Sequence, residues 1–108
     1  MSDTQEARSN QEITMLVLNT APELEENLID YLLCFEQIEG FTSFQVYGHG
    51  EHHSLSVAEQ VAGRRKRSQY EIFIANSAIP NLLAGLASAV GRDIVYWELT
   101  ARNFGRVG

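Results

Sequence analysis

Two segments with helical periodicity, each following a strand-like segment, constrain the fold of this chain more than any other feature. The first begins near Pro22 and the second follows Ser77, which can cap its first turn. Their apolar positions are Leu24, Leu28, Ile29, Leu32 and Phe35 in the first, and Ile79, Leu82, Leu83, Leu86 and Val90 in the second. Each set forms one stripe along a helix, so both helices are expected to pack by one face. Gly40 and Gly91 are the predicted stops.

Four strand-like segments accompany these helices, at residues 13–18, 41–47, 69–74 and 94–99. The first, ITMLVL, is almost continuously apolar, which indicates a central strand. The order β-α-β-β-α-β predicts an α+β, ferredoxin-like fold, with an antiparallel four-stranded sheet and two helices on one face. We expect residues 13–108 to form a single domain, and residues 1–12 to be a disordered lead-in.

Composition narrows the range of functions. The net charge of −6 disfavours general nucleic-acid binding, and the single cysteine, Cys34, allows no intrachain disulfide and favours the cytoplasm. No apolar run reaches about 18 residues, so direct membrane insertion is not expected. The sequence has no nucleophile elbow and no phosphate-binding loop of the Walker type, so we predict that the protein is not an enzyme.

Ligand chemistry is expected between the second and third strands. In Gly48-His49-Gly50, two glycines would let the backbone approach an anion, although an ordinary strand-ending turn has the same signature. After Gly63, the run Arg64-Arg65-Lys66-Arg67 could pair with phosphates, or could be a solvated charge run or a partner for the acidic first helix. Further anion candidates are Arg92, Arg102 and Arg106.

Three histidines, His49, His52 and His53, lie within five residues of one another. Imidazoles at this spacing could share a transition metal such as Zn²⁺, Cu²⁺ or Ni²⁺, but an exposed loop without metal is also compatible with the pattern. The helix-free face of the predicted sheet is a second open question. Small domains often cover such a face by oligomerising, and the strand aromatics Phe44, Tyr47, Tyr96 and Trp97 would suit that interface.

Three motifs resemble those of the PII-like superfamily of trimeric signalling proteins. Residues 46–50 resemble the V-x-G-x-G that closes the second strand, residues 58–61 resemble the A-E-x-V beyond the T-loop, and residues 94–96 resemble the last-strand motif I-F-V-Y. The resemblance covers residues 13–103. It is greatest to a small uncharacterised branch found beside heavy-metal efflux or inorganic-carbon genes.

This resemblance implies a homotrimer with nucleotide clefts between subunits and a T-loop at about residues 48–63. The implied nucleotide contacts are Gly48, His49, Gly50, Gly63, Arg64, Arg65, Arg92, Arg102 and Arg106. The effector would be an adenine nucleotide, with bicarbonate as a possible second ligand. The T-loop would then act on a membrane transporter or an efflux component.

Three departures from the PII-like pattern modify these expectations. The loop before the last strand is reduced to Gly91-Arg92-Asp93, which favours AMP or ADP over ATP. The T-loop is short and lacks the tyrosine that is modified in relatives, while its histidines are unusual. The alternative function is therefore a metal-binding accessory or sensor protein that uses His49, His52 and His53 and is linked to heavy-metal efflux.

Overall fold

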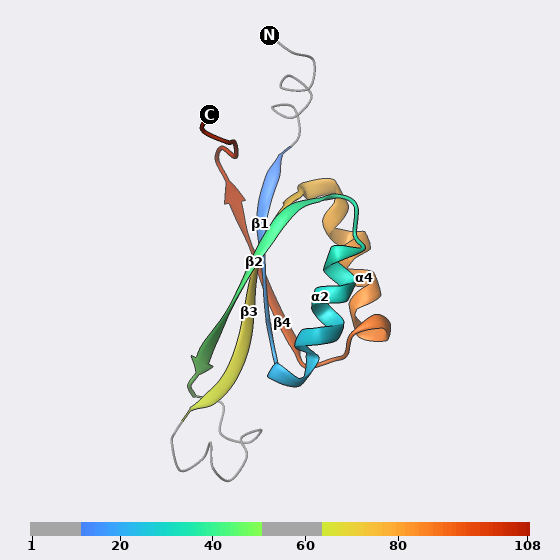
Figure 1. The fold of residues 1–108 in the computed structure, drawn as a ribbon, viewed down its shortest axis with the longest axis vertical. Helices are drawn as coiled ribbons and strands as arrows, with labels where there is room; N and C mark the ends of the chain where they lie inside the picture. Colours follow the sequence, from blue (N-terminus) through green and yellow to red (C-terminus); the bar gives the residue numbers. More distant parts are fainter. Residues whose placement is uncertain (1–11, 51–63) are drawn as a thin grey trace.

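The computed structural model describes residues 12–50 and 64–108 and has the predicted α+β architecture (Figure 1). The elements are β1 (Ile13–Thr20), the 3-10 turn η1 (Pro22–Leu24), α2 (Glu25–Leu33), β2 (Ile38–Gly48), β3 (Arg65–Ala75), the 3-10 turn η2 (Asn76–Ala78), α4 (Ile79–Ala89) and β4 (Ile94–Ala101). The strands form one antiparallel sheet in the order β2-β3-β1-β4, and both helices lie on one of its faces. The ferredoxin-like prediction, with the first strand central, is confirmed.

Strand alternation divides the side chains between two faces of the sheet. The even-numbered residues of β1 and those of β3 from Ser68 onward point toward α2 and α4, and their apolar members form the core with the helices. The fully buried members of this core are Leu16, Leu18, Leu28, Leu32, Tyr70, Ile72, Ile74 and Leu82. The odd-numbered residues of β1, β3 and β4 point the other way, onto what we call the helix-free face. Burial of the apolar stripes against the sheet therefore explains why both helices share one side.

The helix ends differ in part from the sequence prediction. Helix α2 ends at Leu33, so Gly40 is not its stop; instead Gly40 lies inside β2 with a φ of +121°. The register of β2 against β3 shifts between Ile38 and Phe41, so Gly40 supplies the left-handed conformation of a β-bulge. Ser77 lies in η2 and does not cap α4.

Gly91, by contrast, ends α4 as predicted. Its N–H donates to the Leu86 carbonyl at 3.1 Å, just beyond the last residue of the helix. A Cβ at this position would lie 2.8 Å from Leu24 Cδ2, so any other residue would require the Leu24 side chain to shift. The predicted short helix at 57–62 lies outside the described residues. Within the ranges 12–50 and 64–108, no helix is both long enough and apolar enough to cross a membrane.

Candidate functional site

Strands β2 and β3 extend beyond the end of β1 as a two-stranded arm. β1 pairs with β3 as far as Thr20, opposite Ser68, whereas residues 65–67 of β3 pair with residues 46–48 of β2. We call residues 46–48 and 65–67 the hairpin arm, which lies at the lower end of the sheet in Figure 1. The predicted start of this strand at Gln69 is wrong, because the basic run forms the first residues of the strand.

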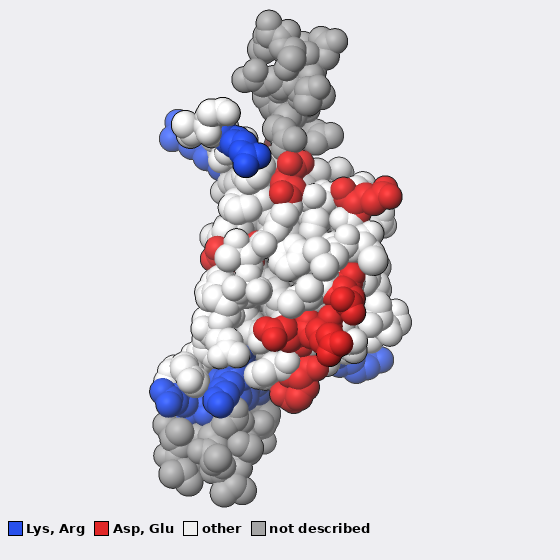
Figure 2. Space-filling model, in the orientation of Figure 1, with Lys and Arg blue, Asp and Glu red and all other residues white. Residues whose placement is uncertain are grey.

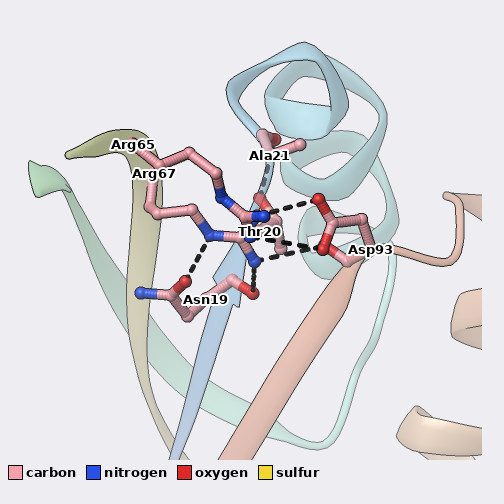
Figure 3. A network of polar contacts seen from close by, with 6 residues as sticks. All are labelled: Asn19, Thr20, Ala21, Arg65, Arg67 and Asp93. Carbon is pink, nitrogen blue, oxygen red and sulfur yellow. Dashed lines mark hydrogen bonds and ion pairs between the residues drawn. The ribbon is translucent and has the colours of Figure 1, made fainter. Parts of the chain in front are cut away.

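Arg67 reaches from the arm to the ends of β1 and β4. Its guanidinium donates to Asn19 Oδ1 at 2.6 Å, to the Asn19 carbonyl at 2.8 Å and to Asp93 Oδ2 at 2.9 Å (Figure 3). The side chain is only 3% exposed. A charge this deeply buried is tolerated because it is paired and hydrogen-bonded, so Arg67 holds the site together rather than offering itself to a ligand.

Asp93, in the turn before β4, joins two arginines. One carboxylate oxygen accepts from Arg67, and the other lies 3.6 Å from Arg65 Nη2. The backbone carbonyl of Asp93 accepts a bond of 3.4 Å from the Ala21 N–H, which ties the turn to the end of β1. The Asp93 side chain is half-exposed and the Arg65 side chain 13% exposed, so both remain within reach of a ligand.

Beside this network is a hollow of about 200 Å³ on the helix-free face. It is lined by Asn19, Gly48, His49, Arg65, Arg67, Val95 and Trp97. The register explains the grouping, because Gly48 lies opposite Arg65 and Asn19 lies opposite Val95. Guanidinium, imidazole and indole groups therefore share one small space, which suits an anion attached to an apolar or aromatic group.

Many charged side chains gather in groups of one sign on the face shown in Figure 2, although basic side chains also border the acidic group. Basic side chains lie at the end of the hairpin arm, and acidic side chains, including Glu23, Glu25 and Glu26, lie over η1 and the start of α2. Arg65, Arg67 and Asp93 sum to a charge of +1 at the hollow, although the whole chain carries a net charge of −6.

The structure brings together some of the predicted nucleotide contacts. Gly48, His49 and Arg65 line the hollow, and Gly50 follows directly with a φ of +99°, a conformation that favours glycine. Arg64 instead lies over the Tyr47 ring, with its guanidinium carbon 4.2 Å from the ring centroid. Strand alternation places Arg64 on the opposite side of the arm from Arg65. Gly63 lies outside the described residues.

The other predicted arginines do not line the hollow of the same chain. Arg92 is exposed in the turn before β4. Arg102 and Arg106 follow the far end of β4, and Arg102 lies seven residues beyond Val95, roughly 23 Å along an extended strand. Phe104, between them, packs on Phe73 with ring centroids 4.9 Å apart, which holds this tail at the far end of the helix-free face.

The four strand aromatics are divided between the two faces. Phe44 and Trp97 lie on the helix-free face, where Phe44 is opposite Gln69 and Trp97 is opposite Val17. Tyr96 lies opposite the core residue Leu18, so it faces the helix side, and so does Tyr47 by alternation from Phe44. Expecting all four on one interface was therefore wrong, since neighbouring residues of a strand point to opposite faces.

The metal prediction concerns a segment that is only partly described. His49 lines the hollow, whereas His52 and His53 lie outside the described residues. Among residues 12–50 and 64–108, no three His, Cys, Asp or Glu side chains are grouped closely enough to hold a metal ion. The three-histidine site stays a prediction.

Four residues of the site are not predicted as ligand contacts from the sequence: Asn19, Asp93, Val95 and Trp97. Arg67 is predicted only as one member of the basic run, and its pairing partner Asp93 lies 26 positions away. The strand register brings Asn19 and Val95 together, because β1 continues beyond the end of the predicted strand and pairs Asn19 with Val95. Trp97, the only tryptophan in the sequence, is predicted to lie at an interface and not at a ligand site.

Together, the fold and the hollow define a class of protein: a small ferredoxin-like α+β domain with a hollow, lined by basic and apolar side chains, at the base of a β-hairpin arm. Within this class, the chain belongs to the DUF3240 family, described as proteins of unknown function, whose profile matches residues 10–108. No functionally curated protein matches the chain significantly.

Solved structures share the fold at low sequence identity. A DUF3240 family protein from Shewanella baltica is 21% identical, with a TM-score of 0.74, and the match covers 89% of this chain and 97% of that one. A Bacillus cereus protein related to NIF3 is 14% identical, with a TM-score of 0.64, and covers 86% of this chain but only 26% of its own. A functionally unknown Pediococcus pentosaceus protein is 12% identical, with a TM-score of 0.59, over 90% and 99% of the two chains. These likenesses show the fold alone.

Proposed function

We propose that this protein is a non-catalytic regulatory sensor of the PII-like kind that binds AMP or ADP at the hollow. The observation that carries the proposal is the convergence of Gly48, His49 and Arg65 with Trp97 in one small space. An arginine can bind a phosphate through two parallel hydrogen bonds, and an indole ring offers a surface for a ribose or a base. No group in this set is arranged as a nucleophile with its base, which favours binding over catalysis.

The size of the hollow favours a binding site that is shared between two subunits. At about 200 Å³ it is smaller than the roughly 300–1,000 Å³ of pockets that hold drug-sized ligands, so one chain would enclose only part of a nucleotide. The remainder would lie against a second subunit of a homotrimer. In that assembly neighbouring copies would supply further phosphate contacts, either through Arg92 or through Arg102 and Arg106, which lie at opposite ends of β4.

The half-exposed apolar side chains of the helix-free face favour such an assembly. Phe44, Trp97 and Leu99 are each 39–48% exposed, and all three lie on this face. Burying apolar area is the main drive for association between subunits, and aromatic residues are enriched in such interfaces. A trimer would therefore cover apolar surface that the helices leave open.

Residues 48–63 would transmit ligand binding to a partner protein, and the proposed location is the cytoplasm. The hollow includes Gly48 and His49, the first two residues of this segment, and Arg65, just beyond its end. A ligand that binds one conformation of these residues more tightly than the others would raise the population of that conformation. That change would regulate a membrane transporter or an efflux component, with bicarbonate as a possible second ligand.

The test is calorimetric titration of metal-stripped protein with AMP, ADP and ATP, each with and without bicarbonate. We expect micromolar binding of AMP or ADP, and Arg65→Ala should weaken it about 10- to 100-fold, the value of a charged hydrogen-bonding contact. Lys66→Ala is the matched control, because it removes the same charge from the neighbouring residue on the opposite face of β3.

Absence of heat with every nucleotide would overturn the nucleotide proposal, and equal losses in Arg65→Ala and Lys66→Ala would remove the assignment to the hollow. The same metal-stripped protein, titrated with zinc, copper and nickel, tests the alternative. A triple His→Ala variant at positions 49, 52 and 53 that binds metal as tightly as the parent would exclude the histidine site.

A further inference from the structure

We infer that Asp93 sets the charge selectivity of the hollow by occupying, on Arg65, the position that an anionic ligand would take. The inference rests on the proposed role of the hollow as an anion site and goes further, because it assigns a function to a residue that repels the ligand. Figure 3 shows both guanidinium groups directed at the Asp93 carboxylate. The preferred ligands would be anions of low charge. They would bind Arg65 in competition with Asp93, whose ion pair with Arg65 is the weaker of its two.

The two ion pairs of Asp93 differ in strength. The Arg67 pair is a short hydrogen bond of 2.9 Å, made by a guanidinium that is 3% exposed and also bound to both Asn19 oxygens. The Arg65 pair is 3.6 Å long, beyond the 2.7–3.2 Å of a good N–H···O bond. A ligand oxygen therefore displaces Asp93 from Arg65 far more readily than from Arg67.

The summed charge of Arg65, Arg67 and Asp93 predicts which anions the hollow prefers. Arg65 and Arg67 contribute two positive charges and Asp93 removes one, so these three groups have a net charge of +1. The Asp93 carboxylate stays close by after Arg65 turns to the ligand, because Arg67 and the Ala21 N–H still hold that residue. Each additional negative charge on the ligand then meets repulsion from Asp93, which offsets its attraction to the arginines.

Asp93→Asn separates this repulsion from the structural role of the residue. Asparagine has the same shape and keeps an oxygen that can accept from Arg67, while the Asn19 contacts of Arg67 do not depend on position 93. The matched control is Glu98→Gln, which removes the same charge from an exposed residue of β4 opposite Leu16. Glu98 lies roughly 16 Å along the strand from Asp93, about two Debye lengths at physiological salt.

The experiment titrates the full chain, Asp93→Asn and Glu98→Gln with orthophosphate, pyrophosphate, tripolyphosphate and ADP at one fixed ionic strength. Heat gives the affinity, and fluorescence of Trp97, the only tryptophan, reports occupation of the hollow. Asp93→Asn should tighten pyrophosphate binding about tenfold, with a larger gain for tripolyphosphate and no gain in Glu98→Gln. No gain in Asp93→Asn, or an equal gain in both variants, would overturn the inference.

The unaltered protein supplies a second measurement should Asp93→Asn not fold. With Asp93 in place, its affinities for orthophosphate and tripolyphosphate should lie within about tenfold of each other, because added charge brings added repulsion. A preference for tripolyphosphate much greater than tenfold would contradict the assigned role of Asp93.

The outcomes also separate this inference from the proposed function. Tighter inorganic anion binding in Asp93→Asn, with ADP binding no better than pyrophosphate, would support the inference and overturn the adenine-nucleotide proposal. Equal ADP binding by the parent and by Asp93→Asn would support the proposal and overturn the inference. An absence of binding for every anion in every variant would overturn both.

Discussion

The two faces of the sheet differ in composition and exposure, although the same alternating strands supply the side chains of both. The helix side holds the apolar core beneath the two helices, with Leu16, Tyr70 and Ile72 completely buried. The helix-free side combines half-exposed apolar residues such as Leu99 with a buried arginine at its lower end. The helix side therefore supplies most of the folding free energy, while the helix-free side retains the polar groups and open surface that binding requires.

Truncating one leucine on each face gives the largest expected effect. Leu16→Ala should lower the free energy of unfolding by about 2–5 kcal/mol, because it leaves a cavity in a closed core. Leu99, which is 48% exposed, neighbours it in the sheet on the other face, and Leu99→Ala should cost the single chain less than about 1 kcal/mol. Urea unfolding measures both. A Leu16→Ala cost below that of Leu99→Ala would contradict the division between the faces.

The same leucine pair also tests the proposed trimer. Leu99→Ala should reduce the trimeric mass measured by light scattering at low protein concentration, because Leu99 lies on the face that association would cover. Leu16→Ala should leave the mass of the folded fraction unchanged. A trimer insensitive to Leu99→Ala, Trp97→Ala and Phe44→Ala would show that the helix-free face is not the subunit interface.

Arg67 provides the next largest effect, because it makes the helix-free face rigid at one end. Arg67→Ala removes the bonds that join β3 to Asn19 and to Asp93, and should cost about 2–3 kcal/mol of stability, the value of hydrogen bonds to a charged group. Lys66 is one residue away and exposed, so Lys66→Ala should change the free energy of unfolding by no more than about 0.5 kcal/mol. Thermal unfolding of both variants measures the difference, and equal costs would remove the structural role of Arg67.

The sequence predicts the closed face better than the open one for a physical reason. The core residues recur in the sequence with the apolar periodicity of helices and strands. Local patterns therefore predict the strands, the helices and the central position of β1. The strand boundaries were less accurate. Residues 65–67 resemble a loop charge run, but they pair with β2 because the hairpin continues beyond β1.

The candidate site depends on partners that no local pattern reveals. Arg67 meets Asp93 across 26 positions and Asn19 across 48, and these contacts exist only once the strand order is set. The glycines and Arg65 could be found beforehand, because a Gly-x-Gly strand end and a basic run are local signals. The sequence places Asp93 only in a shortened loop, since its role depends on which arginines the fold brings to it.

The smallest expected effect concerns a titratable group on the closed face. Burial raises the pKa of Tyr70 above its ordinary value of 10.0, and the nearby negative charge of Glu25 raises it further. In the unfolded chain this phenol ionises near pH 10, whereas in the folded protein it keeps its proton. The folded state therefore loses stability as the pH rises above 10, by up to about 1.4 kcal/mol per pH unit until the folded-state pKa is reached.

Tyr70→Phe removes this contribution and should flatten the fall in stability between pH 10 and 11, while leaving the pH dependence below pH 9 unchanged. Urea unfolding of the parent and the variant across this range measures the difference. Tyr31, whose pKa burial also raises, contributes in the same direction, so the double variant Tyr31→Phe, Tyr70→Phe should be flatter still. An alkaline loss as steep in Tyr70→Phe as in the parent would mean that the helix side admits water to this hydroxyl, and the contrast between a closed and an open face would then fail at Tyr70.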